Sequence, residues 1–441
     1  MKSQTLKTGA ICLAIVAAAL ISNRIGIVQG QMKKTPGEGF AAVPGLKGGQ
    51  DPFGPYDPVP GWPKPLEESM PDADHKGWTW SQATNITVAG PNRFIILQKG
   101  ELPVIPKNVP TTWLPQLGPG LRYPPGIGVP LREAASATPS CGGRPYPTGV
   151  TPNPNCPVAG PDGRYGRPGV DWRWEHVITV VDANGNTIED WRQYDSIWGR
   201  PHDAAISPYD PEKNIWLVDA DNHFVTKMTN DGKKRLMTLG TPGVPGTDDT
   251  HFARPTFIAF MDKNTMYLAD GYDGTRVIKY DMSGKKLMQW GQKGNEPNEM
   301  RPGYFNSVHG IAVDPTTRRV YINDRNNGRL QVFDENGKFL DQWSFGPRPP
   351  MNIHQIWMGQ DHKLWAADQG GNKMLQYDAG GHFLYAWGTQ GTCSGCIWGV
   401  HGFTTDADGN LYTAEVRSGR VQKFTPRKGA NPDFLIGKPW K

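Results

Sequence analysis

The sequence has no long block of charges of one sign. Its 47 lysines and arginines are interleaved with 42 aspartates and glutamates, which leaves a net charge of +5. Proteins that bind nucleic acid usually carry a clustered basic face, so this distribution argues against a nucleic-acid partner. It gives only a weak case for binding to a membrane surface.

Long apolar runs are also absent, apart from one near the N-terminus. Residues 10–21 form an apolar run behind two lysines, and this run is shorter than the roughly 20 residues that span a bilayer. We expect a secretory signal peptide over residues 1–31 and a secreted or periplasmic mature chain without stable membrane insertion. An uncleaved N-terminal anchor is the alternative.

Cysteine is scarce, with five in the chain, one of them in the apolar run. Cys141 and Cys156 bracket a loop rich in proline and glycine, and Cys393 and Cys396 form a CxxC motif. Outside the cytosol, four such cysteines favour two local disulfides over a metal clip. The sequence does not determine how they pair.

Glycine, proline and tryptophan are abundant, at 54, 41 and 16 residues. This composition is typical of many short strands joined by tight turns. Residues 32–77 are rich in proline and glycine and predict an extended arm. The remainder, 78–441, predicts one repeating domain that carries an insertion with two cysteines at about 106–168.

The domain repeats with a period of 44 to 54 residues. Each unit has an apolar strand that ends in an acid, a polar turn and a second alternating strand, and the acids are Asp219, Asp270, Asp324, Asp368 and Glu415. This period with strand-only content predicts an all-β, six-bladed β-propeller with four-stranded antiparallel blades around a central channel. An irregular earlier unit, "RFIILQKGELPVI" and "HVITVVDANGNTIEDW", supplies the sixth blade; seven blades is the alternative.

Histidines occupy equivalent positions in several repeats. The short strand before each repeated strand carries, in order, His202, Thr256, His309, His354 and His401. The innermost strands of a propeller line the channel, so alternate members of six blades stand a third of a turn apart. His202, His309 and His401 are such a set, and three converging imidazoles predict an open divalent-metal site, with zinc the natural occupant.

The other histidines carry weaker signals. His354 could be a fourth ligand, a residue that supports a ligand or a structural residue, and we favour the structural interpretation. The remaining six are expected to be surface or packing residues: His75, His176, His223, His251, His362 and His382.

Two side chains follow the repeated acids into their turns. Tyr272 comes after Asp270 and Arg325 after Asp324. A divalent cation favours the phenolate form of a neighbouring tyrosine, which can then act as a base. An arginine at the same channel mouth could bind a carboxylate with two donors. The alternative is that these residues only join neighbouring blades.

From Gly199 to about Thr425 the chain resembles the NHL-repeat propeller of the peptidyl-α-hydroxyglycine amidating lyases. The resemblance rests on "PHDAAIS", "HFARPT", "DGYDGTR", "QWGQKGNEPNEMRPGYFNSVHGIAV" and "INDRNNGRLQVF". It implies zinc bound by His202, His309 and His401, and catalysis by Tyr272 and Arg325. A further family arginine corresponds to Lys99, which keeps the charge but loses the guanidinium fork.

The resemblance also implies a reaction, the zinc-assisted breakdown of a carbinolamide. Tyr272 would take a proton from the substrate hydroxyl, C–N cleavage would release an amide and glyoxylate, and Arg325, helped by Lys99, would hold the substrate carboxylate. The family's acid directly after the third histidine, a structural calcium ligand, is Gly402 here, which argues against calcium.

Three functions stay open from the sequence. The first is an extracytoplasmic, monomeric zinc lyase acting on a small molecule or peptide that has a carboxylate. The second is a metal-dependent, lactonase-like hydrolase, which rests on analogy of fold and does not need the Tyr272 and Arg325 pair. The third is a non-catalytic NHL-repeat binding module, against which the three histidines in register count.

Overall fold

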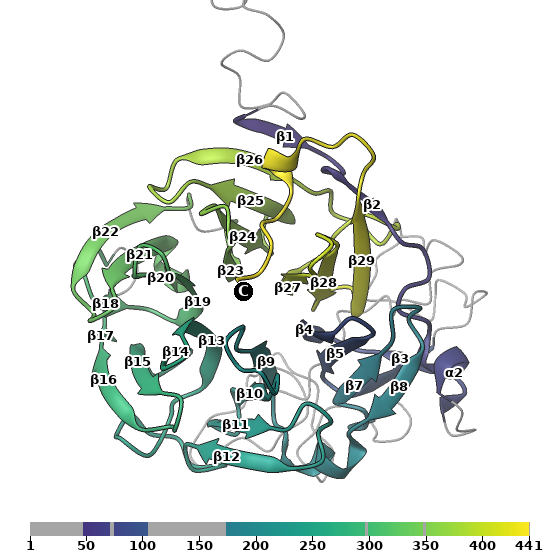
Figure 1. The fold of residues 1–441 in the computed structure, drawn as a ribbon, viewed down its shortest axis with the longest axis horizontal. Helices are drawn as coiled ribbons and strands as arrows, with labels where there is room; N and C mark the ends of the chain where they lie inside the picture. Colours follow the sequence, from purple (N-terminus) through teal and green to yellow (C-terminus); the bar gives the residue numbers. More distant parts are fainter. Residues whose placement is uncertain (1–46, 71–74, 105–172, 296–298, 347–349, 441) are drawn as a thin grey trace, which may run out of the picture.

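The computed structural model describes residues 47–70, 75–104, 173–295, 299–346 and 350–440. The predicted signal peptide, the insertion at about 106–168, Cys141 and Cys156 lie outside these residues. Within them, the chain forms six blades around a central channel (Figure 1). The predicted six-bladed β-propeller is therefore confirmed.

In the first three blades, the strands follow one another along the chain from the channel outwards. Blade one consists of β4 (Ala83–Gly90), β5 (Arg93–Gln98), β7 (Ile178–Val181) and β8 (Thr187–Asp190). Blade two consists of β9 (Pro201–Ile206), β10 (Ile215–Asp219), β11 (Phe224–Met228) and β12 (Arg235–Leu239). Blade three consists of β13 (Pro255–Asp262), β14 (Thr265–Asp270), β15 (Arg276–Asp281) and β16 (Lys286–Trp290).

The second half repeats this order. Blade four consists of β19 (Val308–Asp314), β20 (Arg319–Asp324), β21 (Arg329–Asp334) and β22 (Phe339–Ser344). Blade five consists of β23 (Ile353–Met358), β24 (Leu364–Asp368), β25 (Lys373–Tyr377) and β26 (Phe383–Trp387). Blade six contains β27 (Val400–Thr405), β28 (Leu411–Glu415) and β29 (Arg420–Pro426).

Burial follows from each strand's place in its blade. The second strands are buried along nearly their whole length, as in β10 and β14, because both of their faces pack on neighbouring blades. Such strands are predicted from continuous apolar runs. The outer strands of blades two and three have one face exposed to solvent: β12 and β16 contain only exposed and half-buried positions.

The predicted N-terminal arm contributes strands to the last two blades. β2 (Tyr56–Pro58) pairs antiparallel with β29 and completes blade six. β1 (Gly49–Asp51) pairs parallel with β26 at the outer edge of blade five. Because blade six joins a segment from before blade one to the end of the repeats, the ring of blades is closed by hydrogen bonds.

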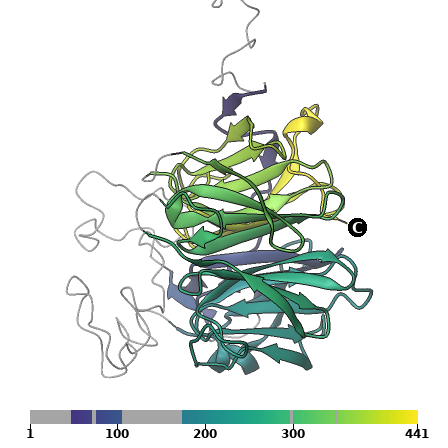
Figure 2. The same ribbon diagram turned by 90° about the vertical axis from the view of Figure 1, so that its left-hand side faces the viewer.

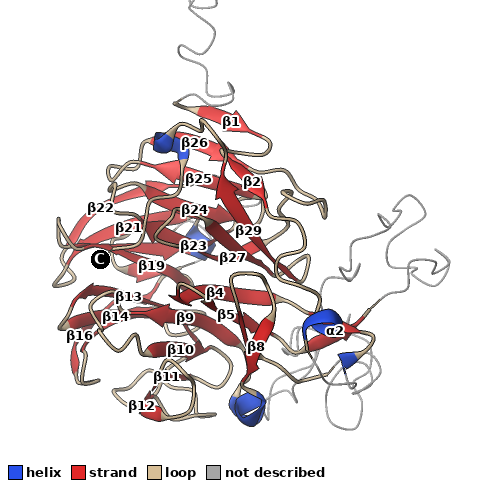
Figure 3. Ribbon diagram, turned by 45° about the vertical axis from the view of Figure 1, so that its right-hand side comes forward, coloured by secondary structure: helices blue, strands red, loops and turns tan. Residues whose placement is uncertain are grey.

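Small elements complete the described part of the chain, where helix is a minor component (blue in Figure 3). They are β3 (Trp78–Trp80), β6 (Glu101–Pro103), β17 (Gln292–Lys293), β18 (Tyr304–Phe305), α2 (Leu66–Ser69), η4 (Arg192–Ile197), η5 (Arg325–Asn327) and η6 (Pro432–Phe434). No helix in the described ranges is long and apolar enough to cross a membrane.

The loop between blades five and six carries a disulfide. Cys393 and Cys396 are bonded to each other. The Arg420 guanidinium donates to the carbonyl oxygen of Cys396 at 2.6 Å and to that of Gly391 at 3.1 Å. One of the two predicted local disulfides is therefore present, and blade six holds its loop in place.

Candidate metal centre

The repeated acids fix where each inner strand begins. Asp219 accepts a hydrogen bond from the Gly199 amide at 2.6 Å, and Asp324 accepts one from the Asn306 amide at 2.7 Å. Each of these amides lies three residues before a channel histidine. The same bond recurs in the other repeats, as Ala253 to Asp270, Asn352 to Asp368 and Trp398 to Glu415, and in blade one as Ser81 to Gln98.

The second residue of every inner strand occupies the equivalent place in its blade. In order around the six blades these residues are Thr84, His202, Thr256, His309, His354 and His401. His202, His309 and His401 come from alternate blades, and their possible ligand atoms lie within 4.8 Å of one another. The structure therefore brings the three predicted ligands together at the axis, and we name them the central triad.

Each triad histidine is held by a backbone carbonyl of the next blade. The Nδ1 atom of His202 lies 2.9 Å from the Thr256 oxygen, that of His401 lies 2.7 Å from the Thr84 oxygen, and that of His309 lies 3.3 Å from the His354 oxygen. A carbonyl can only accept, so Nδ1 carries the proton and the Nε2 lone pair is left for a metal.

Burial keeps the triad in the form that binds metal. It lowers the pKa of His202 and His309 well below the ordinary value and lowers the pKa of His401 to about 3. All three imidazoles are therefore neutral near pH 7, as metal ligands must be. Three neutral imidazole nitrogens that leave one position open are the donor set of a catalytic zinc site, so the triad fits a divalent metal ion.

The Tyr272 hydroxyl lies against the triad. Its oxygen is 3.1 Å from Nε2 of His202 and 3.0 Å from Nε2 of His309. The Arg325 guanidinium lies 4.9 Å from the centre of the Tyr272 ring. The two predicted catalytic side chains thus meet at the triad, although they come from turns in different blades.

Lys99 approaches the triad from blade one. Its Nζ atom donates to Oε1 of Gln82 at 2.7 Å. Burial is the main cause of the low pKa of His202 and of His401, and the Lys99 charge lowers the pKa of both further. Lys99 therefore joins Tyr272 and Arg325 at the same end of the channel as the triad.

Two further arginines surround Tyr272. The guanidinium of Arg254 lies 4.5 Å and that of Arg200 lies 5.5 Å from the centre of the Tyr272 ring. Both contact the carboxylate of Asp221, at 3.2 Å from Arg254 Nε and 3.5 Å from Arg200 Nε. We did not identify them from the sequence, although both share a pattern: each arginine lies two residues before a channel position and directly before a proline.

His354 has contacts that differ from those of the triad. Its Nε2 atom is 2.9 Å from Oε1 of Gln369 and 3.2 Å from Nδ2 of Asn352. Its backbone oxygen lies against Nδ1 of His309. His354 therefore supports the predicted ligand His309 through its backbone oxygen, and its own Nε2 is engaged by Gln369 and Asn352.

Gly271 allows Tyr272 to reach the triad. A Cβ atom at this position would lie 1.5 Å from the Val308 carbonyl oxygen. Gly271→Ala must therefore displace the turn, and we expect it to lower the free energy of unfolding by about 1–3 kcal/mol, as overpacking does. Chemical denaturation measures this loss; a variant as stable as the wild type would show that the close approach does not constrain the turn.

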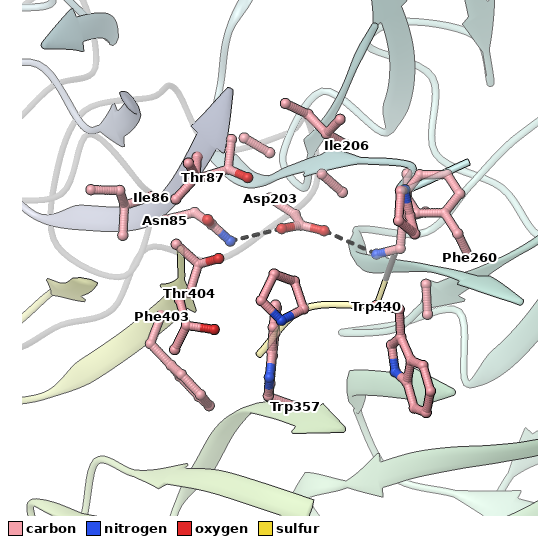
Figure 4. Close-up of a pocket in the computed structure, with 18 of the residues that line it drawn as sticks. Asn85, Ile86, Thr87, Asp203, Ile206, Phe260, Trp357, Phe403, Thr404 and Trp440 are labelled. Atoms are coloured by element: carbon pink, nitrogen blue, oxygen red, sulfur yellow. Dashed lines mark hydrogen bonds between the residues drawn. The ribbon is translucent and has the colours of Figure 1, made fainter. Parts of the chain in front are cut away.

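A cavity of about 780 Å³ lies further along the inner strands, beyond the triad (Figure 4). Asp203, next to His202, projects into it and accepts from Asn85 Nδ2 at 2.7 Å and from the Ile258 amide at 3.0 Å. The C-terminal segment contributes Trp440, whose indole donates to the Met358 oxygen at 3.0 Å. In the side view of Figure 2 the C-terminus lies on one flat face of the propeller, so this segment covers one end of the channel.

Burial raises the pKa of Asp203 to about 7. The folded protein therefore binds this proton more tightly than the unfolded chain, and the stability that results is complete below about pH 4 and lost as the pH rises through about 7. Asp203→Asn has no such loss. Relative to the wild type, we expect the variant to gain about 1.4 kcal/mol of stability per pH unit between pH 4 and 7.

Denaturation of both metal-free proteins at pH 5 and pH 7 measures this difference. The side-chain amide that Asp203→Asn introduces can replace the carboxyl group if Asn85 turns its own amide over, so the variant is expected to fold. A stability difference that does not change between the two pH values would contradict a raised pKa.

The chain is similar to known propeller proteins. A family model described as a six-bladed β-propeller matches residues 306–412. Peptidyl-alpha-hydroxyglycine alpha-amidating lyase 1 of Drosophila melanogaster is 28% identical over 291 residues, which cover 59% of this chain and 50% of that protein. NHL repeat-containing protein 3 of Mus musculus is 32% identical over 175 residues, which cover 38% of this chain and 48% of that protein.

Among solved structures, virginiamycin B lyase from Staphylococcus aureus matches 78% of this chain and 95% of its own, with 15% identity and a TM-score of 0.42. The chain spans about half the length of the two curated relatives. It is a six-bladed β-propeller that resembles the amidating lyases and the NHL-repeat proteins.

Proposed function

We propose that this propeller, similar in sequence to the amidating lyases, is a zinc-dependent lyase that cleaves the C–N bond of an α-hydroxylated amide. The products are an amide and glyoxylate or a related aldehyde. One observation carries the proposal: the Tyr272 hydroxyl lies within 3.1 Å of Nε2 of both His202 and His309. A base in that place can reach a substrate hydroxyl bound at the triad.

His202, His309 and His401 would hold the metal through Nε2. A bound zinc ion supplies Lewis acidity, which lowers the pKa of a coordinated hydroxyl. In its phenolate form, which a neighbouring cation favours, Tyr272 takes the hydroxyl proton, and the electron pair of that O–H bond forms the aldehyde C=O. The C–N bond breaks, its electrons pass to nitrogen, and nitrogen takes the proton back from the Tyr272 hydroxyl to give the amide.

The charges around Tyr272 select the substrate. Arg325, Arg200 and Arg254 lie within 5.5 Å of the centre of its ring. Asp221 balances part of this charge through its contacts with Arg200 and Arg254. The remaining positive charge favours a substrate that carries a carboxylate near its hydroxyl, which Arg325 binds with help from Lys99.

The proposal includes the oligomeric state and the compartment of the enzyme. It acts as a monomer in a secreted or periplasmic compartment, on a small molecule or a peptide. The Cys393–Cys396 bond supports this compartment, because disulfides persist in oxidising environments.

Product analysis tests the reaction. The full chain, loaded with zinc, is given an N-acylated α-hydroxyglycine, and glyoxylate and the amide are both quantified. Equal amounts of the two products are expected. A parallel assay with simple lactones separates the lyase from a hydrolase: lactone opening without glyoxylate release would contradict the proposal in favour of the hydrolase.

A further inference from the structure

Two histidines predicted as surface or packing residues form a second buried cluster. His75 precedes β3, and His176 precedes β7; both are fully buried, as is Glu101 at the start of β6. Oε1 of Glu101 is 2.8 Å from Nδ1 of His176 and 3.3 Å from Nδ1 of His75. The surface interpretation is therefore wrong for both histidines.

Several polar atoms of this cluster have no partner among the described residues. Glu101 Oε1 and the Nδ1 atoms of both histidines contact one another as ion pairs, but Glu101 Oε2 and the Nε2 atoms of His75 and His176 are buried and have no hydrogen-bond partner within the described part of the chain. Each buried polar group without a partner costs about 1–3 kcal/mol. Three such atoms beside an ion-paired carboxylate are an arrangement that folded proteins rarely leave without a ligand or an ordered water.

The backbone around His176 is held in a conformation that L-residues rarely adopt. Its φ angle is +53°. The Asp195 carboxylate accepts from the His176 amide at 2.9 Å and from the Val177 amide at 3.1 Å, and Gln98 donates to the His176 oxygen at 2.9 Å. Strained residues held in this way concentrate at functional sites, and the imidazole of this one contacts Glu101.

Backbone hydrogen bonds hold Glu101 in place. Its amide donates to the Arg173 oxygen at 2.8 Å, and the Arg173 amide donates back to the Glu101 oxygen at 2.9 Å. β6 also pairs with β3, with Trp80 opposite Glu101. Three separate segments of the chain therefore meet with their side chains already in place.

The geometry points to a second metal site: we infer that His75, Glu101 and His176 bind a divalent transition-metal ion, zinc in the first instance. Their possible ligand atoms lie within 4.8 Å of one another. Two imidazoles and one carboxylate are an established donor set for zinc and for other first-row divalent ions. The ion would replace the missing hydrogen bonds and would join the segments before β3 and β7 to β6, beside blade one (Figure 1).

Zinc stoichiometry tests the second site without any use of activity. The full chain and its variants are stripped with a chelator, exposed to zinc alone, separated from free ion and analysed for metal. We expect two zinc ions in the wild type, one in Glu101→Gln, one in His309→Ala and none in the double variant. Zinc should also raise the melting temperature of His309→Ala but not that of the double variant.

A second variant of the same cluster tests whether zinc loss in Glu101→Gln comes from misfolding rather than from the loss of a ligand. His176→Asn should also bind one zinc ion, and asparagine tolerates the left-handed φ angle of this position. Two zinc ions in both Glu101→Gln and His176→Asn, or a single ion in the wild type that only His309→Ala removes, would overturn the second site. A single ion that only Glu101→Gln and His176→Asn remove would support the second site and contradict the central one, so the two proposals fail separately.

Discussion

His309→Ala is expected to lose the central zinc ion and to lower kcat/KM for glyoxylate release by about a thousandfold or more. The substitution removes one of three imidazoles, and two ligands from blades two and six hold a metal far less tightly than three. His309 is fully buried and its Nδ1 contact with the His354 oxygen directs Nε2 to the axis. Metal analysis and steady-state kinetics on the same preparation measure both losses.

His354→Ala is the matched control for this prediction. His354 occupies the equivalent position in the next blade, and its ring centre is only 4.9 Å from that of His309. Its Nε2 is engaged by Gln369, and the backbone oxygen that supports His309 stays in the variant. We expect the control to keep its central metal; a control that loses metal as completely as His309→Ala would show that the site is not the predicted triad.

Tyr272→Phe is expected to lower kcat by about 10²–10⁴-fold, the usual contribution of a positioned general base, and to leave the zinc content unchanged. The phenyl ring keeps its place against Arg254 and Arg325, which lie over the ring. The substitution removes the hydroxyl that faces His202 and His309 and that is also hydrogen-bonded to Arg200. KM should change little, since Arg325 and Lys99, which bind the carboxylate, remain.

Tyr304→Phe provides the comparison for Tyr272→Phe. Tyr304 also has an arginine over its ring, with the Arg301 guanidinium 3.7 Å from its centre, but it lies in β18, before the inner strand of blade four. It should keep full activity. If Tyr272→Phe were as active as Tyr304→Phe, Tyr272 would not be the base.

Register explains why the fold and the triad could be predicted. The repeated acids mark the second strand of each blade, and the histidines stand at the start of the short strand that precedes it, so His202, His309 and His401 are predicted from their equivalent places in the repeat. The same register places Arg200 and Arg254 two residues before channel positions, and it could have identified them. In the sequence the acids only mark where each repeat lies. The sequence does not show that Asp219 and its equivalents accept hydrogen bonds from the amides that precede the inner strands.

The second cluster could not be predicted, for a physical reason. His75, Glu101 and His176 belong to segments outside the regular repeat, and no period relates them. The pairing of β3 with β6 and the bridge between Glu101 and Arg173 bring them together. Such contacts depend on tertiary structure, which a single sequence does not reveal.

The most direct test of the central claim is glyoxylate release before and after metal removal. The wild-type chain is stripped with a chelator and assayed with an N-acylated α-hydroxyglycine, and zinc is then added back. We predict that removal abolishes glyoxylate release and that zinc restores it in the wild type and in His354→Ala but not in His309→Ala. Full activity in the stripped protein, or no glyoxylate from the zinc-loaded protein, would contradict a metal-dependent lyase built on His202, His309 and His401.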